Sequence, residues 1–401
     1  MHRHEEQYPH NRGIESFFND LKHVKLSGAL TALYSNRTIR QFSRGLIGIF
    51  YPILLYTKLD FSVYKLVVFF LISFFIWMLI VPIGARIMSR IGLKKSLILS
   101  VAFGWGWFYS LKWFEMDGAI LWLGLALLFM SLDRFLYWVP YHTDFAKFTN
   151  KKTRGRQMSF LIAVASIVSI VVPFISGQVI SEYGYGALLM FAMIIYIMSV
   201  IPLFLIPDVR ENYSFSYWQT YKEVFKKKNR RMFFAYGADG VQSIVGAVVW
   251  PVFIWLLLDQ NYSAVGVVSS LIILGSLLLQ LLMGNLTDRF NKRQILRWGS
   301  IFNSIGWMVK IFVETGFQIF VASTYHSFAS IVMRTPFDTL MYEKAADSGH
   351  YIDEYTVLRE IYLCIGQILM LFFIILSFWL WQSFAASFII AALAALIISI
   401  L

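Results

Sequence analysis

The chain has 401 residues, of which 58% are hydrophobic, 18% are aromatic and only 14% are charged. Soluble globular domains carry about 25% charged residues, so the composition excludes that class and indicates an integral membrane protein. The formal net charge of +12 also fits a nucleic-acid-binding protein, so the positions of the basic residues must decide between the two.

Residues 1–37 precede the first long apolar run and are predicted to form an N-terminal segment. Apolar residues recur at helical spacing from Ile14 to Val24, which predicts an amphipathic helix at the membrane interface. His2, His4 and His10 can bind metals but lack the spacing of metal ligands, so we predict no metal site.

About twelve apolar segments follow, each close to the length of about 20 residues that crosses a bilayer. The predicted limits are 38–57, 64–87, 96–114, 118–146, 156–179, 185–206, 232–258, 263–286, 294–313, 317–341, 355–378 and 382–401. They predict an all-α membrane protein with two six-helix bundles, 38–206 and 232–401, joined by a polar linker at 207–231.

The basic residues lie mostly in alternate loops. Of the 35 Lys and Arg residues, 26 fall on the side of the two termini, 4 fall on the other side, and the rest lie inside spans. By the positive-inside rule, both termini are cytoplasmic in a multi-pass cell (cytoplasmic or inner) membrane protein. The net charge is therefore explained by membrane orientation, and no nucleic-acid partner is predicted. The basic run from Lys226 to Arg231 in the linker predicts contact with anionic lipids of the bilayer.

The two halves of the chain repeat each other. Tyr51-Pro52 on the first span matches Trp250-Pro251 on the seventh, at an offset of 199 residues between the prolines, and Pro140 matches Pro336 at an offset of 196. Matching anchors at nearly one offset indicate a duplicated six-helix unit with both copies in the same orientation.

A charged motif also occurs twice, each time between the second and third spans of a half. The second copy reads Gly284-Asn285-Leu286-Thr287-Asp288-Arg289, with basic residues after it, and the first copy has Ala85, Ser89 and Arg90 at the matching positions. This spacing resembles the loop between the second and third helices of major facilitator superfamily (MFS) transporters.

The resemblance implies the MFS fold, alternating access around a midplane cavity between the halves, no cofactor and usually a monomer. In that family the loop holds one access state closed, which implies a latch role for Gly284, Asp288, Arg289 and Arg90. Ser89 lacks the negative charge, so the first latch should be weaker.

Asp133 and Arg134 on the fourth span resemble the family's proton-coupling motif, with Trp138 where the family has glycine. An ion pair between Arg134 and a neighbouring helix is the alternative. On the fifth span, Pro173 to Gly177 resembles the family's antiporter motif in part, which favours export over import, although small residues there also permit close helix packing.

Other ionisable residues inside spans are costly and therefore candidates for function. Asp239 and His326 are further coupling candidates, with a rim carboxylate and a polar packing residue as their structural alternatives. Arg44 is expected to receive an anionic group or to pair with Asp133 or Asp144. Arg334 and Asp338 lie four residues apart, so they can pair on one helix face as a gate latch or, for Arg334, contact substrate.

Aromatic residues gather near the repeat anchors and either form interfacial belts or line the substrate cavity. The cavity candidates among them are Tyr137, Trp138, Tyr141 and Trp250.

The sequence has no metal-protease, phosphate-loop or serine-nucleophile motif, so no enzyme activity is predicted. We predict a secondary transporter of a small organic or amphipathic solute, with proton-coupled export. The alternatives are an uncoupled facilitator, a lipid or lysolipid transporter, and a membrane scaffold or sensor without transport.

Overall fold

The computed structural model describes residues 28–148, 154–207, 216–283, 291–347 and 352–400, and every regular element within these ranges is a helix. The elements are α2 (Gly28–Ile47), α3 (Phe50–Lys58), α4 (Val63–Ile91), α5 (Leu93–Asp117), α6 (Ile120–Phe148), α7 (Arg154–Met198), α8 (Val200–Leu203), α9 (Tyr217–Val224), η1 (Lys227–Asn229), α10 (Arg230–Ile244), η2 (Val245–Val249), α11 (Trp250–Leu257), α12 (Tyr262–Met283), α13 (Lys292–Val309), η4 (Lys310–Phe312), α14 (Gly316–Asp347), α15 (Ile352–Trp381) and α16 (Ala385–Ile398).

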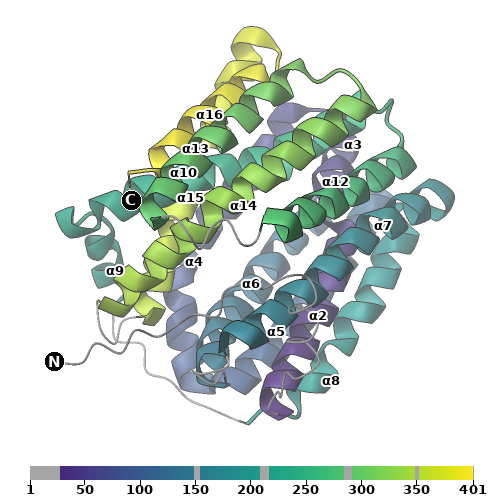
Figure 1. The fold of residues 1–401 in the computed structure, drawn as a ribbon. Coiled ribbons are helices and arrows are strands. Elements are labelled where there is room, and N and C mark those ends of the chain that lie inside the picture. The colour runs from purple at the N-terminus through teal and green to yellow at the C-terminus, as the bar shows by residue number, and fades with distance from the viewer. Residues whose placement is uncertain (1–27, 149–153, 208–215, 284–290, 348–351, 401) are drawn as a thin grey trace.

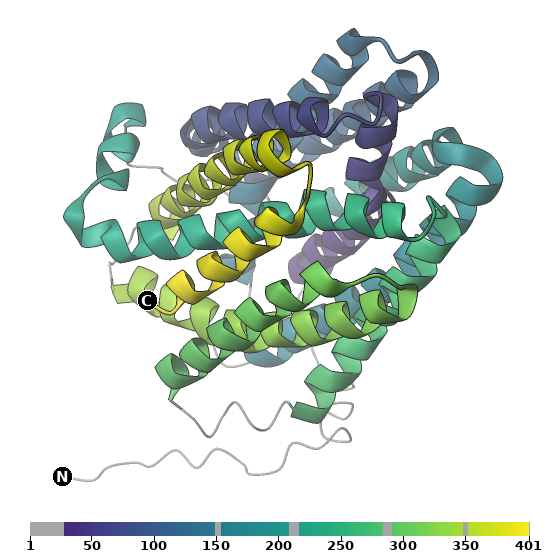
Figure 2. The same ribbon diagram turned by 90° about the horizontal axis from the view of Figure 1, so that it is seen from above.

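These elements form two helical bundles, one from α2 to α8 and the other from α10 to α16 (Figure 1). α2 and α3 make up the first predicted span, and α10, η2 and α11 make up the seventh. α7 contains the fifth and sixth, which meet at Gly184, where a φ of 79° turns the chain. The short α16 packs against α10 and α13 within the second bundle (Figure 2).

The first helix begins at Gly28 rather than at residue 38, so the predicted N-terminal segment contributes its last residues to α2. The amphipathic helix predicted from Ile14 to Val24 lies outside the described residues, as do Gly284, Asp288 and Arg289 of the second motif loop.

Six stretches of the described helices are long and apolar enough to cross a membrane, judged by length and composition. They are Val63–Ile83, Ile120–Trp138, Ser166–Leu203, Lys227–Leu257, Tyr262–Leu279 and Val357–Trp381. Other long helices contain basic residues, such as Arg40 and Arg44 in α2, which lower their mean hydropathy. The chain is a multi-pass membrane protein whose fold places charge inside its bundles.

The first and seventh spans break at the same place in the repeat. The chain turns between α2 and α3 shortly before Pro52, and a π-helix from Val245 to Val249 precedes Pro251. A proline has no N–H to continue the helical hydrogen bonds, so each of these breaks in the helix accommodates the proline that follows it. π-Helical turns often occur at functional sites, and both breaks lie beside the cavity described below.

The bundles meet along two seams. At the first seam α7 packs against α12, where Gly177 and Gly266 let the backbones approach closely. Gln178 Nε2 donates to Ser263 Oγ at 2.7 Å across this seam. The ring of Tyr262 packs against Phe50, with 6.4 Å between the ring centroids. We call this end, which carries the α3–α4 and α11–α12 turns, the distal end.

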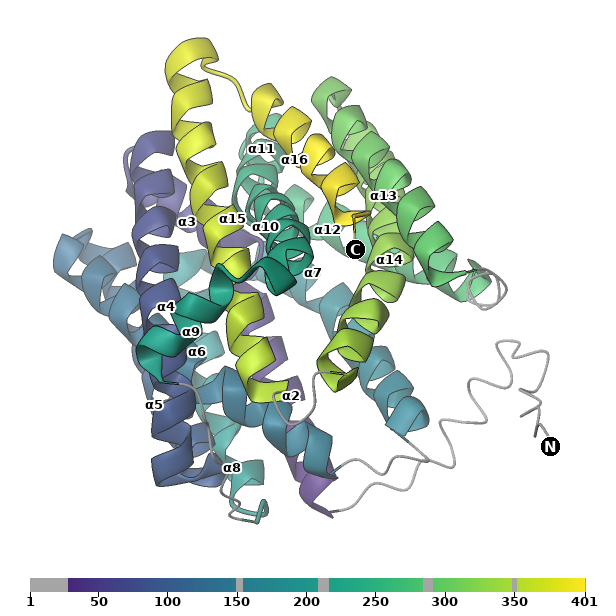
Figure 3. The ribbon, with the colours of Figure 1, turned by 90° about the vertical axis from the view of Figure 1, so that its left-hand side faces the viewer.

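At the second seam α4 packs against α15 and the linker helix α9 lies across both, as Figure 3 shows. Tyr221 of α9 donates to the carbonyl of Met78 in α4 at 2.8 Å, and Tyr362 of α15 donates to the carbonyl of Val224 at 3.1 Å. The predicted polar linker therefore contains a helix that bonds to both bundles. We call the end that carries α9 the linker end.

The buried carboxylate of Glu223 joins α9 to the basic run after it. It pairs with Lys226 and lies 3.4 Å from Lys228 Nζ. Burial raises the pKa of Glu223, but the hydrogen bond from Lys226 and the charge of Lys228 outweigh it and lower the pKa overall. A carboxyl group with a lowered pKa stabilises the fold above its unfolded pKa, so this contribution is lost only as the pH falls through the folded value.

Candidate functional site

A cavity of about 620 Å³ lies between the two bundles. This volume falls within the range of about 300–1,000 Å³ that is usual for small-molecule sites. Helices α2 and α7 line it from the N-terminal bundle, and α10, α12, α13 and α14 line it from the C-terminal bundle. Its lining residues include Gln41, Gly45, Gly48, Ile49, Ser169, Pro173, Gln242, Gly246, Trp250, Ser269, Ile272, Asn303, Trp307, Lys310, Ser323, His326 and Arg334.

Lys310, in η4, is a basic residue of the cavity wall for which the sequence analysis proposed no role. Its side chain is buried, and its Nζ lies 4.2 Å from the ring centroid of Trp250 and 4.3 Å from that of Trp307. The electron-rich faces of two indole rings thus surround the ammonium group. Within the described ranges, no salt bridge joins Lys310 to a carboxylate.

A polar group of three residues adjoins Lys310. Asn303 Nδ2 donates to Gln242 Oε1 at 2.6 Å, and Trp307 Nε1 donates to the same oxygen at 3.0 Å. Gln242 Nε2 and Asn303 Oδ1 are buried and have no hydrogen-bond partner in the described part of the chain. The cavity wall therefore contains an amide donor and an amide acceptor that no described residue bonds, and that a bound solute could use.

His326 packs directly beside this group. Its ring centroid lies 4.3 Å from that of Trp307, and its buried Nε2 has no hydrogen-bond partner among the described residues. A Cβ at Gly306 would lie 2.7 Å from His326 Cδ2, so only glycine fits at this point of α13. The structure thus brings the predicted coupling candidate His326 and the predicted cavity residue Trp250 to one wall.

Arg334 also lines the cavity, and it pairs across helices rather than along its own. Its Nη2 donates to Asp239 Oδ1 at 2.6 Å, from α14 to α10. Arg334 does not form the expected pair with Asp338 on its own helix, because the buried Asp239 lies opposite it on α10. Asp338 is partly buried one turn further along α14.

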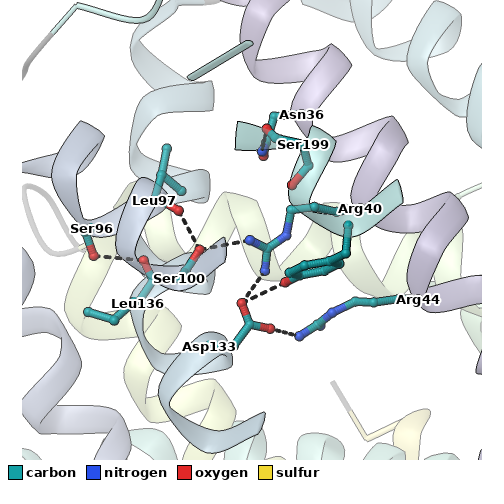
Figure 4. Close-up of polar contacts among 10 residues, drawn as sticks. Asn36, Arg40, Arg44, Ser96, Leu97, Ser100, Asp133, Leu136 and Ser199 are labelled. Carbon is teal, nitrogen blue, oxygen red and sulfur yellow. Dashed lines mark hydrogen bonds and ion pairs between the residues drawn. The ribbon is translucent and has the colours of Figure 1, made fainter. Parts of the chain in front are cut away.

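A second ion cluster lies inside the N-terminal bundle (Figure 4). Asp133 of α6 is fully buried and accepts from Arg40 Nη2 at 2.6 Å, from the hydroxyl of Tyr196 at 2.8 Å and from Arg44. Arg40 also donates to Ser100 Oγ at 2.8 Å. Arg44 therefore contacts Asp133, one of the two carboxylates that the sequence suggested for it, and the cluster contains two cations for one anion.

Arg40 is one of the basic residues that lie inside predicted spans, and the sequence analysis proposed no role for it. Its guanidinium carbon lies 3.6 Å from the ring centroid of Tyr137 and 4.9 Å from that of Tyr196. Tyr137, a predicted cavity residue, thus packs against Arg40 within the bundle. The spacing of four residues between Arg40 and Arg44, which puts both on one helix face, is the signal that could have revealed this cluster.

Gly104→Ala tests how tightly this cluster is packed. A Cβ at Gly104 would lie 2.2 Å from Tyr196 Cε1, so the ring must leave the position from which its hydroxyl bonds Asp133. We expect the variant to lose about 1–3 kcal/mol of stability, the usual cost of overpacking, measured as a lower thermal unfolding temperature of the purified protein. Gly124→Ala is the control, since nothing lies within 4 Å of its Cβ; equal stability of the two variants would contradict this packing.

Arg134 links the two bundles at the second seam. Its Nη2 lies 2.8 Å from Glu360 Oε2 of α15, and its guanidinium stacks 4.2 Å from the ring centroid of Trp77. Trp77 Nε1 donates to the same carboxylate at 3.3 Å. Arg134 therefore forms an ion pair with another helix, which was the alternative to a coupling role. Its partner, Glu360, comes from the other half of the chain.

The remaining predicted residues fall elsewhere. Arg90 is exposed near the end of α4, and Trp138 packs against the core of the bundles. The side chain of Tyr141 lies outside the described residues. Sequence reasoning missed Glu360 as a partner and missed Gln242 and Asn303 altogether, because uncharged amides in apolar helices give no distinctive pattern.

The comparisons with known proteins concern the fold. One similar solved structure is the crystal structure of a POT family transporter in complex with 5-aminolevulinic acid; it covers 92% of this chain and 94% of its own, with a TM-score of 0.70 and 11% sequence identity. No protein-family model matches the sequence, and neither does any curated protein. The likeness confirms the predicted fold, which is of the MFS type with two helical bundles around a central cavity.

Proposed function

We propose that the chain is a secondary active transporter that moves a small organic or amphipathic solute by alternating access, in the direction of export and coupled to protons. The observation that carries this proposal is the cavity of about 620 Å³ between two bundles that touch along separable seams. The solved POT family transporter with the same fold holds 5-aminolevulinic acid, which supports a small organic molecule as the solute.

Alternating access requires the bundles to rock around the cavity. The distal end is closed by α7 against α12, with glycines at the closest approach. Toward the linker end, Arg134 and Trp77 hold Glu360 of the other bundle. We propose that the two bundles rock relative to each other during transport. In this motion the distal seam opens, and the contacts of Arg134 and Trp77 with Glu360 rearrange. The motif residues Gly284, Asp288, Arg289 and Arg90 stay proposed latch residues, together with Asp338.

Among the coupling candidates Asp133, Arg134, Asp239 and His326, Asp239 has the arrangement that best suits proton exchange. It pairs with Arg334, and Arg334 lines the cavity, where a solute would reach it. Protonation of Asp239 would release Arg334 and change the charge of the cavity wall by one unit, so binding of a proton and binding of a solute would influence each other. Asp133, by contrast, is bonded to two arginines and a tyrosine away from the cavity.

The test begins with the purified protein and a diverse solute panel. A ligand that binds the folded state raises the unfolding temperature, and the best solute is then loaded into proteoliposomes with an imposed pH gradient. We expect gradient-driven flux in the native protein. In Asp239→Asn we expect gradient-driven flux to fall about tenfold or more while solute exchange without a gradient stays within about twofold, since one lost proton site removes the driving force only.

Asp259→Asn is the matched control, because this exposed carboxylate lies at the α11–α12 turn. Flux that ignores the pH gradient in the native protein would remove proton coupling from the proposal. A protein that neither binds nor moves any solute would overturn transport itself.

A further inference from the structure

The cavity contains a buried lysine, Lys310, that no carboxylate among the described residues pairs with. Lys310 is only 3% exposed, and its ammonium group contacts the faces of Trp250 and Trp307 in place of an acidic side chain. The nearby Arg334 is balanced by Asp239. Of the lysine and arginine side chains in the described lining, Lys310 is therefore the one that no carboxylate pairs with.

A buried charge without a counter-ion is unfavourable, and contacts with aromatic rings compensate it only in part. Retaining such a lysine inside a span is typical of a site that binds an ion or substrate. The ammonium group has three donors and no acceptor, so an anion is the ligand that would complete its environment.

The surroundings of Lys310 add unused hydrogen-bonding groups. His326 Nε2, Gln242 Nε2 and Ser323 Oγ are buried without a hydrogen-bond partner among the described residues, and all three residues line the cavity. Each can donate to an oxygen. A carboxylate has two oxygens with about four acceptor positions, so it can use the ammonium group and these donors together.

The rest of the wall is apolar. Trp250, Trp307, Ile254 and Ile272 line the same cavity, and flat indole rings suit an aromatic or aliphatic body next to the charged group. One positive charge matches one negative charge, which favours a monocarboxylate over a dianionic phosphate ester.

We infer that the cavity binds a small organic acid, with its carboxylate at Lys310 and its apolar body along Trp250 and Trp307. The inference rests on the proposed transport function and specifies the chemical class of its solute. It assigns Lys310 as the residue that selects for negative charge, with Gln242 and His326 as its neighbours in the site.

The first measurement uses the native protein and pairs of probes of nearly the same shape, one an anionic carboxylate and the other its neutral amide. These are benzoate and benzamide, indole-3-acetate and indole-3-acetamide, and hexanoate and hexanamide, each titrated by calorimetry into the detergent-purified protein. We expect at least one acid to bind about tenfold or more tightly than its amide, the ratio that one added ion pair in a partly desolvated site supports.

The second measurement uses Lys310→Met, with Lys112→Met on α5 of the other bundle as the control. We expect the affinity of Lys310→Met for the acid to fall about tenfold while its affinity for the amide stays within about twofold. We also expect the ligand-free variant to unfold at the same or a higher temperature than the native protein, because an unbalanced buried charge has been removed.

The outcomes separate the two proposals. If amides or benzylamine bind and are transported as well as the acids are, the inference fails and transport stands. If Lys310→Met unfolds at a lower temperature and loses acid and amide binding alike, Lys310 only holds the helices together and the inference fails. If no probe or panel solute binds or moves, both proposals fail.

Discussion

Asp133→Asn is expected to destabilise the protein more than any other single substitution considered for the bundles. Asp133 is the shared carboxylate of Arg40, Arg44 and the Tyr196 hydroxyl. The substitution leaves two guanidinium groups without an anion, and Arg40 is only 2% exposed. Removing one partner of a buried ion pair typically costs about 3–5 kcal/mol, and the measurement is the thermal unfolding temperature in detergent.

A second substitution distinguishes the effect of an unpaired arginine charge from the effect of lost packing around Asp133. Arg44 is about one-third exposed and has room to reorient, whereas the buried Arg40 has none. We therefore expect Arg40→Met, added to Asp133→Asn, to recover most of the lost stability, and Arg44→Met to recover less. An Asp133→Asn protein as stable as Asp259→Asn would contradict the role of this cluster, and so would equal recovery by both arginine variants.

This expectation affects how proton coupling is tested. A loss of flux in Asp133→Asn can come from a destabilised bundle rather than from a missing proton site. Asp239→Asn leaves one arginine without its partner, and Arg334 is 42% exposed, so its charge can be solvated. Asp239→Asn is therefore a cleaner test of proton coupling than Asp133→Asn, although the motif on the fourth span first drew attention to Asp133.

The fold was predictable because its main determinants are local in the sequence. Long apolar runs separated by charged loops specify helices that cross a membrane, and the repeated Pro52 and Pro251 specify equivalent positions in two bundles. The structure adds what these patterns lack: a helix in the linker, the break after Ile47 and the π-helix before Trp250. These depend on packing between helices, which the hydrophobic pattern does not record.

The site was predictable only where a charge stood out against an apolar helix. Arg44, Asp239 and Arg334 were visible in this way, but their partners depend on how the bundles pack. Glu360 lies 226 positions from Arg134, and no pattern in one sequence relates residues so far apart. Lys310 stood near a predicted span end, where a lysine normally reaches the aqueous interface; the structure instead buries it between two indole rings.

The distal seam provides the second large prediction, Gly177→Leu. A Cβ at this position would lie 2.6 Å from the carbonyl oxygen of Tyr262 and 3.0 Å from Gly266 Cα, both in the other bundle. Backbone atoms of two rigid helices cannot move aside as a side chain can, so the clash opposes closure of the distal end. It leaves the inside of each bundle unchanged, and we expect the variant to fold.

The expected result is a shift of the conformational equilibrium away from the distal-closed state. Overpacking costs of about 1–3 kcal/mol correspond to a change of about 5- to 150-fold in the ratio of the two populations. Because transport requires both states, we expect solute flux to fall about tenfold or more. Gly124→Leu, at an exposed position with nothing within 4 Å of its Cβ, is the control for the added bulk.

A cysteine at the seam measures the population directly. Ser263 pairs with Gln178 across the closed seam, and Cys364 is buried, so Ser263→Cys with Cys364→Ala gives a single reporter thiol. Opening of the distal end exposes this thiol, and Gly177→Leu should raise its rate of maleimide labelling while lowering flux. Unchanged labelling and flux would mean that the contact between Gly177 and Gly266 does not gate the cavity. Faster labelling with undiminished flux would mean that closure of the distal end is not required for transport, which contradicts alternating access through this seam.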